Sequence, residues 1–207
     1  MSQFDPRDPS PSPAGNRREF LLHSASLFAL TVGGAVVVDG AISPAAAAPA
    51  QENWGHCGNC NMLFFNGYAQ KGKCPANGAP ARDPHVAAKL GSTLKKYQVT
   101  YDDSAGPGQG DWRFCHKCSV LFFNGYPQKG VCAADKGGHE AAGWFFFLYH
   151  DRNPTLNEED GWRYCDSCHA LFTTKFPNAA GCPGTGKEHA AAGYKFVVGR
   201  RGAASTL

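Results

Sequence analysis

The chain has 207 residues, of which 43% are hydrophobic and 12% aromatic, and its formal net charge is only +3. Such a small charge, with no basic stripe along the sequence, excludes the electrostatic footprint of a nucleic-acid-binding protein. The length predicts one domain or a few small ones, and the 25 glycines predict many turns. None of the nine cysteines falls before residue 57, which separates an N-terminal segment from the rest of the chain.

Residues 1–50 have the organisation of a targeting signal. The string Asn16-Arg17-Arg18-Glu19-Phe20-Leu21-Leu22 resembles the twin-arginine export motif, Ser/Thr-Arg-Arg-x-Phe-Leu-Lys, and departs from it at the first and last positions. The weakly apolar run that follows, 24–38, is shorter than the roughly 20 residues of a spanning helix, so we expect no membrane span in the mature chain. The segment 48–50 (Ala-Pro-Ala) fits a small-x-small cleavage site. A tail with a chance arginine pair is the alternative.

This resemblance implies that the chain is a passenger of the twin-arginine export machinery. It implies an exported protein, either secreted or retained in the cell envelope. That pathway carries proteins that are already folded, so any metal is expected to be loaded in the reducing cytosol before export.

The rest of the chain is three copies of one pattern, and such internal repeats take precedence in predicting a fold. Each copy runs Trp-x2-Cys-x2-Cys-x2-Leu-Phe, and a third Cys follows the second after 13 residues in every copy. One His then follows after 10, 6 and 6 residues, and an aromatic strand-like run closes each copy. We delimit the copies as repeat 1 (51–103), repeat 2 (104–153) and repeat 3 (154–207), after a signal at 1–50.

The predicted elements are short strands and turns. The Trp-x-aromatic-Cys and Leu-Phe-Phe pieces favour strands, as do the closing runs 97–101, 144–149 and 194–198. The Asn-Gly pairs at 66–67 and 124–125 are strong tight-turn signals. The one helical candidate is 86–96, where Gly91 weakens the pattern. We expect the tryptophans that open the copies to be core residues packed on the metal-binding loops.

The fold predicted from these elements is mainly β, with three tandem zinc-binding repeats. Because the linkers between copies are only about 10 to 15 residues long, we favour one pseudo-threefold body that resembles a β-trefoil. The alternative is three separate zinc-ribbon-like modules.

The recurrent cysteines and histidines predict three Cys₃His metal sites. Zinc takes such sets at tetrahedral sites, and four protein ligands leave no position for water or substrate, so each site is expected to be structural. Three zinc ions are therefore the predicted cofactors. The predicted ligands are Cys57, Cys60, Cys74 and His85 in repeat 1, Cys115, Cys118, Cys132 and His139 in repeat 2, and Cys165, Cys168, Cys182 and His189 in repeat 3.

Three other uses of these cysteines remain open. Disulfides suit an oxidising destination, but nine cysteines cannot all pair and disulfides do not account for the recurrent His. Iron–sulfur ligation suits the donor set, but the spacing matches no ferredoxin pattern. The string 165–169 (Cys-Asp-Ser-Cys-His) fits a c-type haem attachment motif, although the other copies have Asn61 and Ser119 where this one has His169.

Over residues 54–198 the repeated string resembles a repeat of exported bacterial proteins that have no assigned activity. This resemblance implies no substrate, and the leading hypothesis is a non-enzymatic module that binds a cell-surface or extracellular ligand, such as a glycan or a protein. The turn Asn-Gly-Tyr-x-Gln-Lys-Gly at 66–72 and 124–130 offers two equivalent exposed sites, or else only shapes the metal loop.

Two other functions are weighed against binding. One is an exported metalloenzyme or oxidoreductase that uses a Cys/His site, although the sequence has no paired acid–base constellation. The other is metal handling outside the cell.

Overall fold

The computed structural model describes residues 48–77, 84–102, 106–176 and 181–201. Nearly all of the predicted export signal lies outside these residues, so that interpretation stays a prediction. Within the described ranges the regular structure is β, apart from one 3₁₀ turn at Pro75–Asn77. No helix in this part of the chain is long and apolar enough to cross a membrane.

Each repeat contributes a hairpin of one long and one short strand, followed by a closing strand. In repeat 1 these are β1 (Ala50–His56), β2 (Leu63–Phe65) and β5 (Lys96–Tyr101). In repeat 2 they are β6 (Gly108–Cys115), β7 (Leu121–Phe123) and β8 (Ala141–Tyr149). In repeat 3 they are β9 (Glu158–Cys165), β10 (Leu171–Thr173) and β11 (Ala191–Arg200).

The register of the hairpins is the same in all three repeats. Each opening tryptophan pairs with the third residue of the short strand: Trp54 with Phe65, Trp112 with Phe123 and Trp162 with Thr173. The closing strand then pairs with the other edge of the long strand, as β5 does with β1, β8 with β6 and β11 with β9. The repeats seen in the sequence are therefore repeats of structure.

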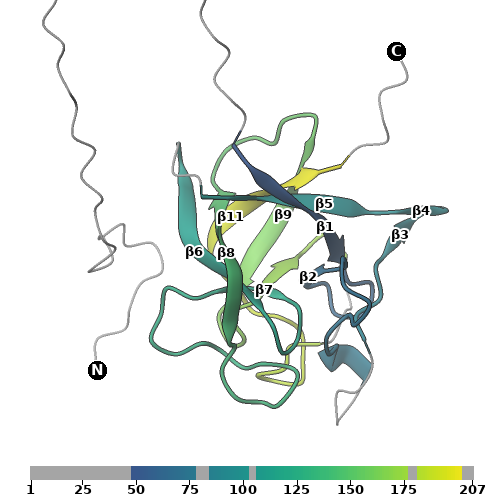
Figure 1. Cartoon of the computed structure of the whole chain (residues 1–207), viewed down its shortest axis with the longest axis vertical. Coiled ribbons are helices and arrows are strands. Elements are labelled where there is room, and N and C mark those ends of the chain that lie inside the picture. Colours follow the sequence, from purple (N-terminus) through teal and green to yellow (C-terminus); the bar gives the residue numbers. More distant parts are fainter. Residues whose placement is uncertain (1–47, 78–83, 103–105, 177–180, 202–207) are drawn as a thin grey trace, which may run out of the picture. The chain divides into compact units, whose positions relative to one another are not determined.

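The closing strands join the repeats in a cycle. Each closing strand pairs, at or just after its end, with the next one: Tyr101 pairs with Phe146, His150 with Phe196, and Arg200 with Tyr97. Figure 1 shows β5 running beside β1 and β8 beside β6. The pairs return from repeat 3 to repeat 1, so the sheet is nearly closed and barrel-like. This confirms the predicted mainly β, pseudo-threefold, β-trefoil-like fold. The alternative of three separate modules does not apply.

Two clusters of buried side chains fill the interior. One holds the nine cysteines with the middle residues of the short strands, Phe64, Phe122 and Phe172. The other holds the opening tryptophans, the flanking residues of the short strands and the closing strands. Successive residues of a strand face opposite sides, so each short strand is buried on both faces and separates the clusters.

The opening tryptophans are core residues, as predicted, but the expectation that they pack on the metal loops is wrong. Apart from one edge contact of Trp162 with His56 at 6.4 Å, their ring contacts lie in the second cluster or with residues packed against it, and these contacts pass from repeat to repeat. Trp54 meets Phe146 edge-on at 5.2 Å, Trp112 meets Phe196 at 5.1 Å and Trp162 meets Tyr97 at 5.1 Å. This second cluster therefore also binds the three repeats into one body.

The predicted helix at 86–96 is also wrong. The structure has a small hairpin there, formed by β3 (Lys89–Leu90) and β4 (Thr93–Leu94) and followed directly by the start of β5. Gly91 lies in its turn with φ +60°, a left-handed conformation that glycine adopts readily and that interrupts an α-helix. Turn geometry at one glycine thus overrides the helical spacing of the neighbouring apolar residues.

A buried carboxylate ties repeat 3 to repeat 1. Glu159 of β9 is only 6% exposed, and it accepts a hydrogen bond of 2.9 Å from the hydroxyl of Tyr97 in β5. The ammonium of Lys95 lies 3.5 Å from the same carboxylate, and Arg200 of β11 lies 3.9 Å away. A buried charge is costly unless it is paired and hydrogen-bonded, so the folded state requires these partners beside the Glu159 carboxylate.

Replacing Tyr97 by phenylalanine is expected to destabilise the fold by about 2 kcal/mol, since it removes one hydrogen bond to a buried charged group. Chemical denaturation of the full chain checks this. Tyr194→Phe is the matched control, because the described residues give its hydroxyl no hydrogen bond, and it is expected to change stability little. Equal losses from both variants would contradict a specific role for the Tyr97–Glu159 contact.

Candidate metal centres

The structure brings each predicted ligand set together. In every set the three sulfurs and one histidine nitrogen lie within 4.8 Å of one another. All nine cysteines are buried and free of disulfides, and among the three predicted ligand histidines only His189 is partly exposed. The twelve residues predicted as ligands thus lie together as three clusters of four.

Two donor–donor distances in each set match a tetrahedral zinc site. Zn–S bonds of about 2.3 Å at tetrahedral angles place two sulfurs about 3.8 Å apart, and a Zn–N bond of about 2.0–2.1 Å gives a sulfur–nitrogen edge of about 3.5 Å. The first and third cysteines of the sets are 3.8, 4.0 and 3.8 Å apart. The second cysteine lies 3.5, 3.4 and 3.4 Å from histidine Nδ1. The residues present therefore fit the ion.

The fold also fixes which histidine nitrogen faces the sulfurs. His85 Nε2 lies 3.1 Å from the carbonyl of Cys118, His139 Nε2 lies 2.9 Å from that of Cys168, and His189 Nε2 lies 3.1 Å from that of Cys60. A carbonyl only accepts, so Nε2 carries the proton and Nδ1 presents its lone pair to the cluster. Hydrogen bonding of the second ring nitrogen is the usual way in which proteins orient a metal-bound histidine.

These hydrogen bonds connect the clusters to one another. Each histidine donates to the second cysteine of the next repeat, and repeat 3 donates back to repeat 1. Each ring also stacks on the middle phenylalanine of its own short strand, with centroids 4.7–4.9 Å apart. The three candidate centres therefore form one cyclic assembly.

The Cys-x2-Cys turn is built by the backbone. In each copy the residue after the second cysteine donates its N–H to the carbonyl of the first, at 2.9, 2.8 and 2.8 Å. That residue has a left-handed conformation in every copy: Asn61 has φ +59°, Ser119 +65° and His169 +60°. The turn directs both sulfurs to one side, and the fold maintains this geometry with three different side chains.

Burial and crowding set the proton affinities of the thiols. Burial raises the pKa of the second cysteine of each set, Cys60, Cys118 and Cys168. In repeat 1, a hydrogen bond from Cys60 and a further one from Cys74 lower the pKa of Cys57. The hydrogen bond between Cys74 and Cys57 in turn raises the pKa of Cys74 to about 12. A cluster of this kind does not hold three thiolates unaided, and a divalent cation supplies the missing positive charge.

The haem interpretation of 165–169 has no support in the arrangement of its residues. Cys165 and Cys168 belong to the third cluster. The ring of His169 lies instead against Tyr126 and Tyr164, with centroids 5.6 and 5.3 Å away. The other described histidines outside the repeat pattern belong to none of the three clusters either.

The Asn-Gly-Tyr turns are less alike than their sequences indicate. Tyr68 is 55% exposed, whereas Tyr126 is half-buried against Tyr164. The turn lysines donate to the backbone of their own turns, Lys71 to Asn66 O and Lys129 to Asn124 O, so they act in shaping the turn. Two equivalent exposed sites are therefore not present.

A groove between repeats 1 and 2 was not predicted from the sequence. Tyr68 and Gln70, from the predicted turn, lie on one wall, and Phe114, His116 and Trp144 of repeat 2 lie on the other. No family model, curated protein or solved structure matches this chain, and the interpretation of its sites therefore rests on their geometry.

Proposed function

We propose that this chain is an exported, non-enzymatic protein, stabilised by three zinc ions, that binds an extracellular or cell-surface ligand such as a glycan. The observation that carries the proposal is the convergence of four protein donors at each cluster. With four protein ligands a tetrahedral zinc site is complete, and the ion contributes folding energy rather than catalysis.

The position of the clusters supports a structural role. The cysteines make up much of one of the two buried clusters of the fold, and each histidine is tied to the next repeat through its second nitrogen. Repeats of this size have little apolar core of their own, and small units of this kind commonly depend on a bound metal. Zinc suits the Cys₃His donor set better than the harder cations, which prefer oxygen.

The export and ligand-binding parts of the proposal are supported by other features of the chain. The arginine pair and the apolar run within 1–50 support passage through the twin-arginine machinery, and folded export accounts for reduced, metal-loaded thiols outside the cytosol. Among the described residues, the surface carries large exposed aromatic side chains, including Tyr68, Trp144 and Phe145. Such a surface is common where proteins meet ligands.

Native mass spectrometry with elemental analysis of the purified full chain tests the metal part. The expected result is three zinc ions per chain and nine reduced thiols. A metal-free chain, lighter by paired hydrogens, would mean disulfides. Iron in place of zinc, or an ion that carries a bound water, would favour the metalloenzyme alternative.

A further inference from the structure

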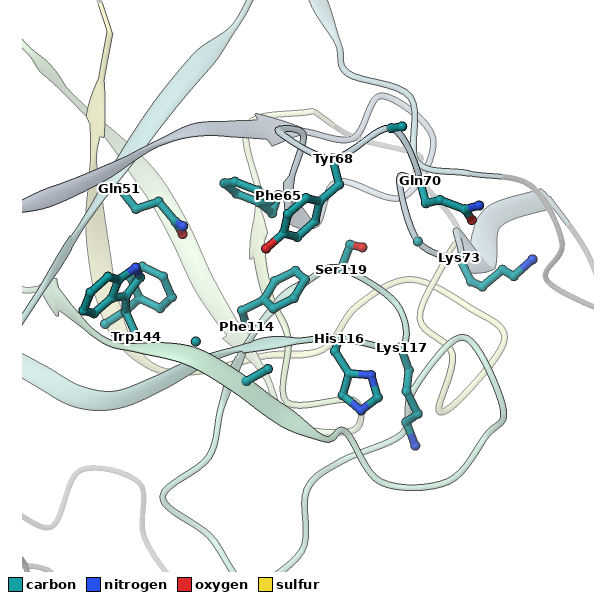
Figure 2. Close-up of a pocket in the computed structure, with 15 residues that line it drawn as sticks. Gln51, Phe65, Tyr68, Gln70, Lys73, Phe114, His116, Lys117, Ser119 and Trp144 are labelled. Atoms are coloured by element: carbon teal, nitrogen blue, oxygen red, sulfur yellow. The ribbon is translucent and has the colours of Figure 1, made fainter.

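An aromatic-lined groove runs between repeats 1 and 2. Its volume is about 600 Å³, which is within the usual range for sites that bind small molecules. Figure 2 shows Tyr68 of repeat 1 facing Phe114 of repeat 2, with Trp144 further along the groove. One face of the Trp144 ring is supported by Tyr101, stacked at 4.6 Å, while the side chain remains 48% exposed. The groove thus has a rigid aromatic platform.

A second cavity of the described surface is similar in size but different in character. Its volume is about 680 Å³, and its lining is mainly polar and charged, with Arg152 and Asp160 among the residues. The aromatic residue in that lining, Phe196, is only 1% exposed. The aromatic groove is therefore the better candidate for a site that recognises a ring.

The pseudo-threefold symmetry places a cleft that corresponds to the groove at each junction, and the one between repeats 2 and 3 is nearly filled. Between repeats 2 and 3 only about 10 Å³ remains, because Tyr126 packs against Tyr164 and His169. Between repeats 3 and 1, Phe176 stacks on His56 at 4.7 Å and lies under the ammonium of Lys95. Ser119 has a smaller side chain than His169 at the matching position, which leaves the first cleft open.

A glutamine in the open groove differs from its counterpart in the filled one. Gln109, three residues before Trp112, accepts a hydrogen bond of 3.2 Å from the indole nitrogen of that tryptophan. Gln51 stands three residues before Trp54, yet the Trp54 indole nitrogen is buried without a partner, and the described residues show no hydrogen bond to the Gln51 side chain. Figure 2 shows the Gln51 amide extending into the groove instead.

The charges of Lys117 and His116 on the groove wall are balanced by carboxylates within the fold. Lys117 is paired with Asp135 at 2.7 Å and with Glu140 at 3.0 Å, and His116 is paired with the same Glu140 at 2.8 Å. The lining near Trp144 is therefore a supported aromatic face next to amide and hydroxyl groups, and the ammonium of Lys73 lies at the other end of the groove. A neutral ring with one apolar face and a hydroxylated edge is complementary to such a lining.

We propose that this groove is the one saccharide-binding site of the chain, in which a neutral sugar ring stacks on Trp144 and Tyr68 and its hydroxyls bond to Gln51. This proposal rests on the proposed function: it locates ligand binding in the groove and names neutral saccharides as the ligand class. Among the described residues, the corresponding cleft between repeats 2 and 3 is nearly filled and the one between repeats 3 and 1 holds the Phe176–His56 stack, so binding is expected at one site per chain and not at three.

Tryptophan fluorescence gives a direct readout, because Trp144 is exposed while Trp54, Trp112 and Trp162 are at most 1% exposed. The zinc-loaded full chain is titrated with cello-, xylo-, malto- and N-acetylated chito-oligosaccharides. At least one series is expected to shift the emission and protect Trp144 from acrylamide quenching, at one site per chain. Binding by calorimetry is expected to weaken about tenfold in Tyr68→Ala and in Trp144→Ala.

The two glutamines form a matched pair. Gln51→Ala is expected to weaken binding several-fold with unchanged thermal stability, whereas Gln109→Ala is expected to lower stability and leave binding unchanged. Tyr126→Ala, in the filled cleft, is expected to change affinity less than twofold.

Three results would overturn the groove assignment. If an oligosaccharide binds and Trp144→Ala and Tyr68→Ala leave its affinity unchanged, the groove is wrong while the proposed function stands. If an acidic series such as oligogalacturonate binds more tightly than the neutral sugars, the ligand class is wrong. If no sugar binds a chain that holds three zinc ions, both the groove site and a glycan ligand are wrong, and the zinc scaffold alone remains.

Discussion

Cys118→Ser is expected to leave the chain with two zinc ions and to destabilise it by about 5 kcal/mol or more. A structural zinc site contributes on the order of 10 kcal/mol to folding, and whole domains are stable by only about 5–15 kcal/mol. The Cys118 sulfur lies 3.4 Å from His139 Nδ1, and a serine hydroxyl does not replace a thiolate as a ligand. Elemental analysis and denaturant unfolding followed by circular dichroism measure both effects.

The matched control lies in the same turn. His116 is exposed, and its described partner is the carboxylate of Glu140, so His116→Ser alters the turn without touching a ligand. It is expected to keep three zinc ions and nearly all of the stability. A Cys118→Ser chain that still binds three zinc ions, or that loses no more stability than His116→Ser, would contradict a structural metal at this cluster.

The same variant also tests the cyclic connection. The Cys118 carbonyl accepts the Nε2–H of His85, so loss of the second site disturbs the first through that bond. Unfolding is therefore expected to stay a single transition at lower denaturant. Separate transitions for one damaged repeat and two intact ones would indicate independent modules.

The three Cys₃His clusters were predictable because each is specified by residues within one repeat. An unvarying Cys-x2-Cys-x13-Cys spacing with a following His specifies four donors within one repeat, and the structure brings together those same four. The β class was predictable for the same reason, since aromatic, β-prone runs recur with Asn-Gly turns between them.

Features that join one repeat to another were not predictable from local patterns. The partner of each histidine Nε2 is a backbone carbonyl of the next repeat, which leaves no mark in residue type. The tryptophans were expected on the metal loops because they stand near the cysteines in sequence, yet adjacent strand residues face opposite sides and so enter different clusters.

The difference between the two Asn-Gly-Tyr turns has the same origin. Tyr68 and Tyr126 occupy nearly identical local sequence, and their exposure depends on the neighbouring repeat. Tyr126 meets Tyr164 and His169, whereas the matching neighbours of Tyr68 are Phe114 and Ser119. Considering one repeat at a time therefore predicted two equivalent sites, whereas the cleft at Tyr68 is open and the cleft at Tyr126 is nearly filled.

Gly130→Ala is expected to destabilise the fold by about 4 kcal/mol, because two costs coincide. Gly130 has φ +65°, which strains any other residue by about 1–2 kcal/mol. A Cβ at this position would lie 2.3 Å from the carbonyl oxygen of Cys168, which accepts the Nε2–H of His139. Moving that carbonyl weakens a buried hydrogen bond, at a further cost of about 1–3 kcal/mol. Denaturant unfolding of the zinc-loaded chain measures the sum.

Gly186→Ala separates the two costs. Gly186 has φ +70°, nearly the same as Gly130, but a Cβ added there would meet nothing within 4 Å, so only the backbone strain of about 1–2 kcal/mol is expected. The excess loss in Gly130→Ala then measures the contact between repeats 2 and 3. Because the displaced carbonyl belongs to a ligand of the third cluster and its donor to a ligand of the second, Gly130→Ala is also expected to release zinc from both sites to a chelator faster than Gly186→Ala. Equal losses of stability in the two variants, with equal rates of zinc release, would mean that the hydrogen bond from His139 to Cys168 does not connect the two centres.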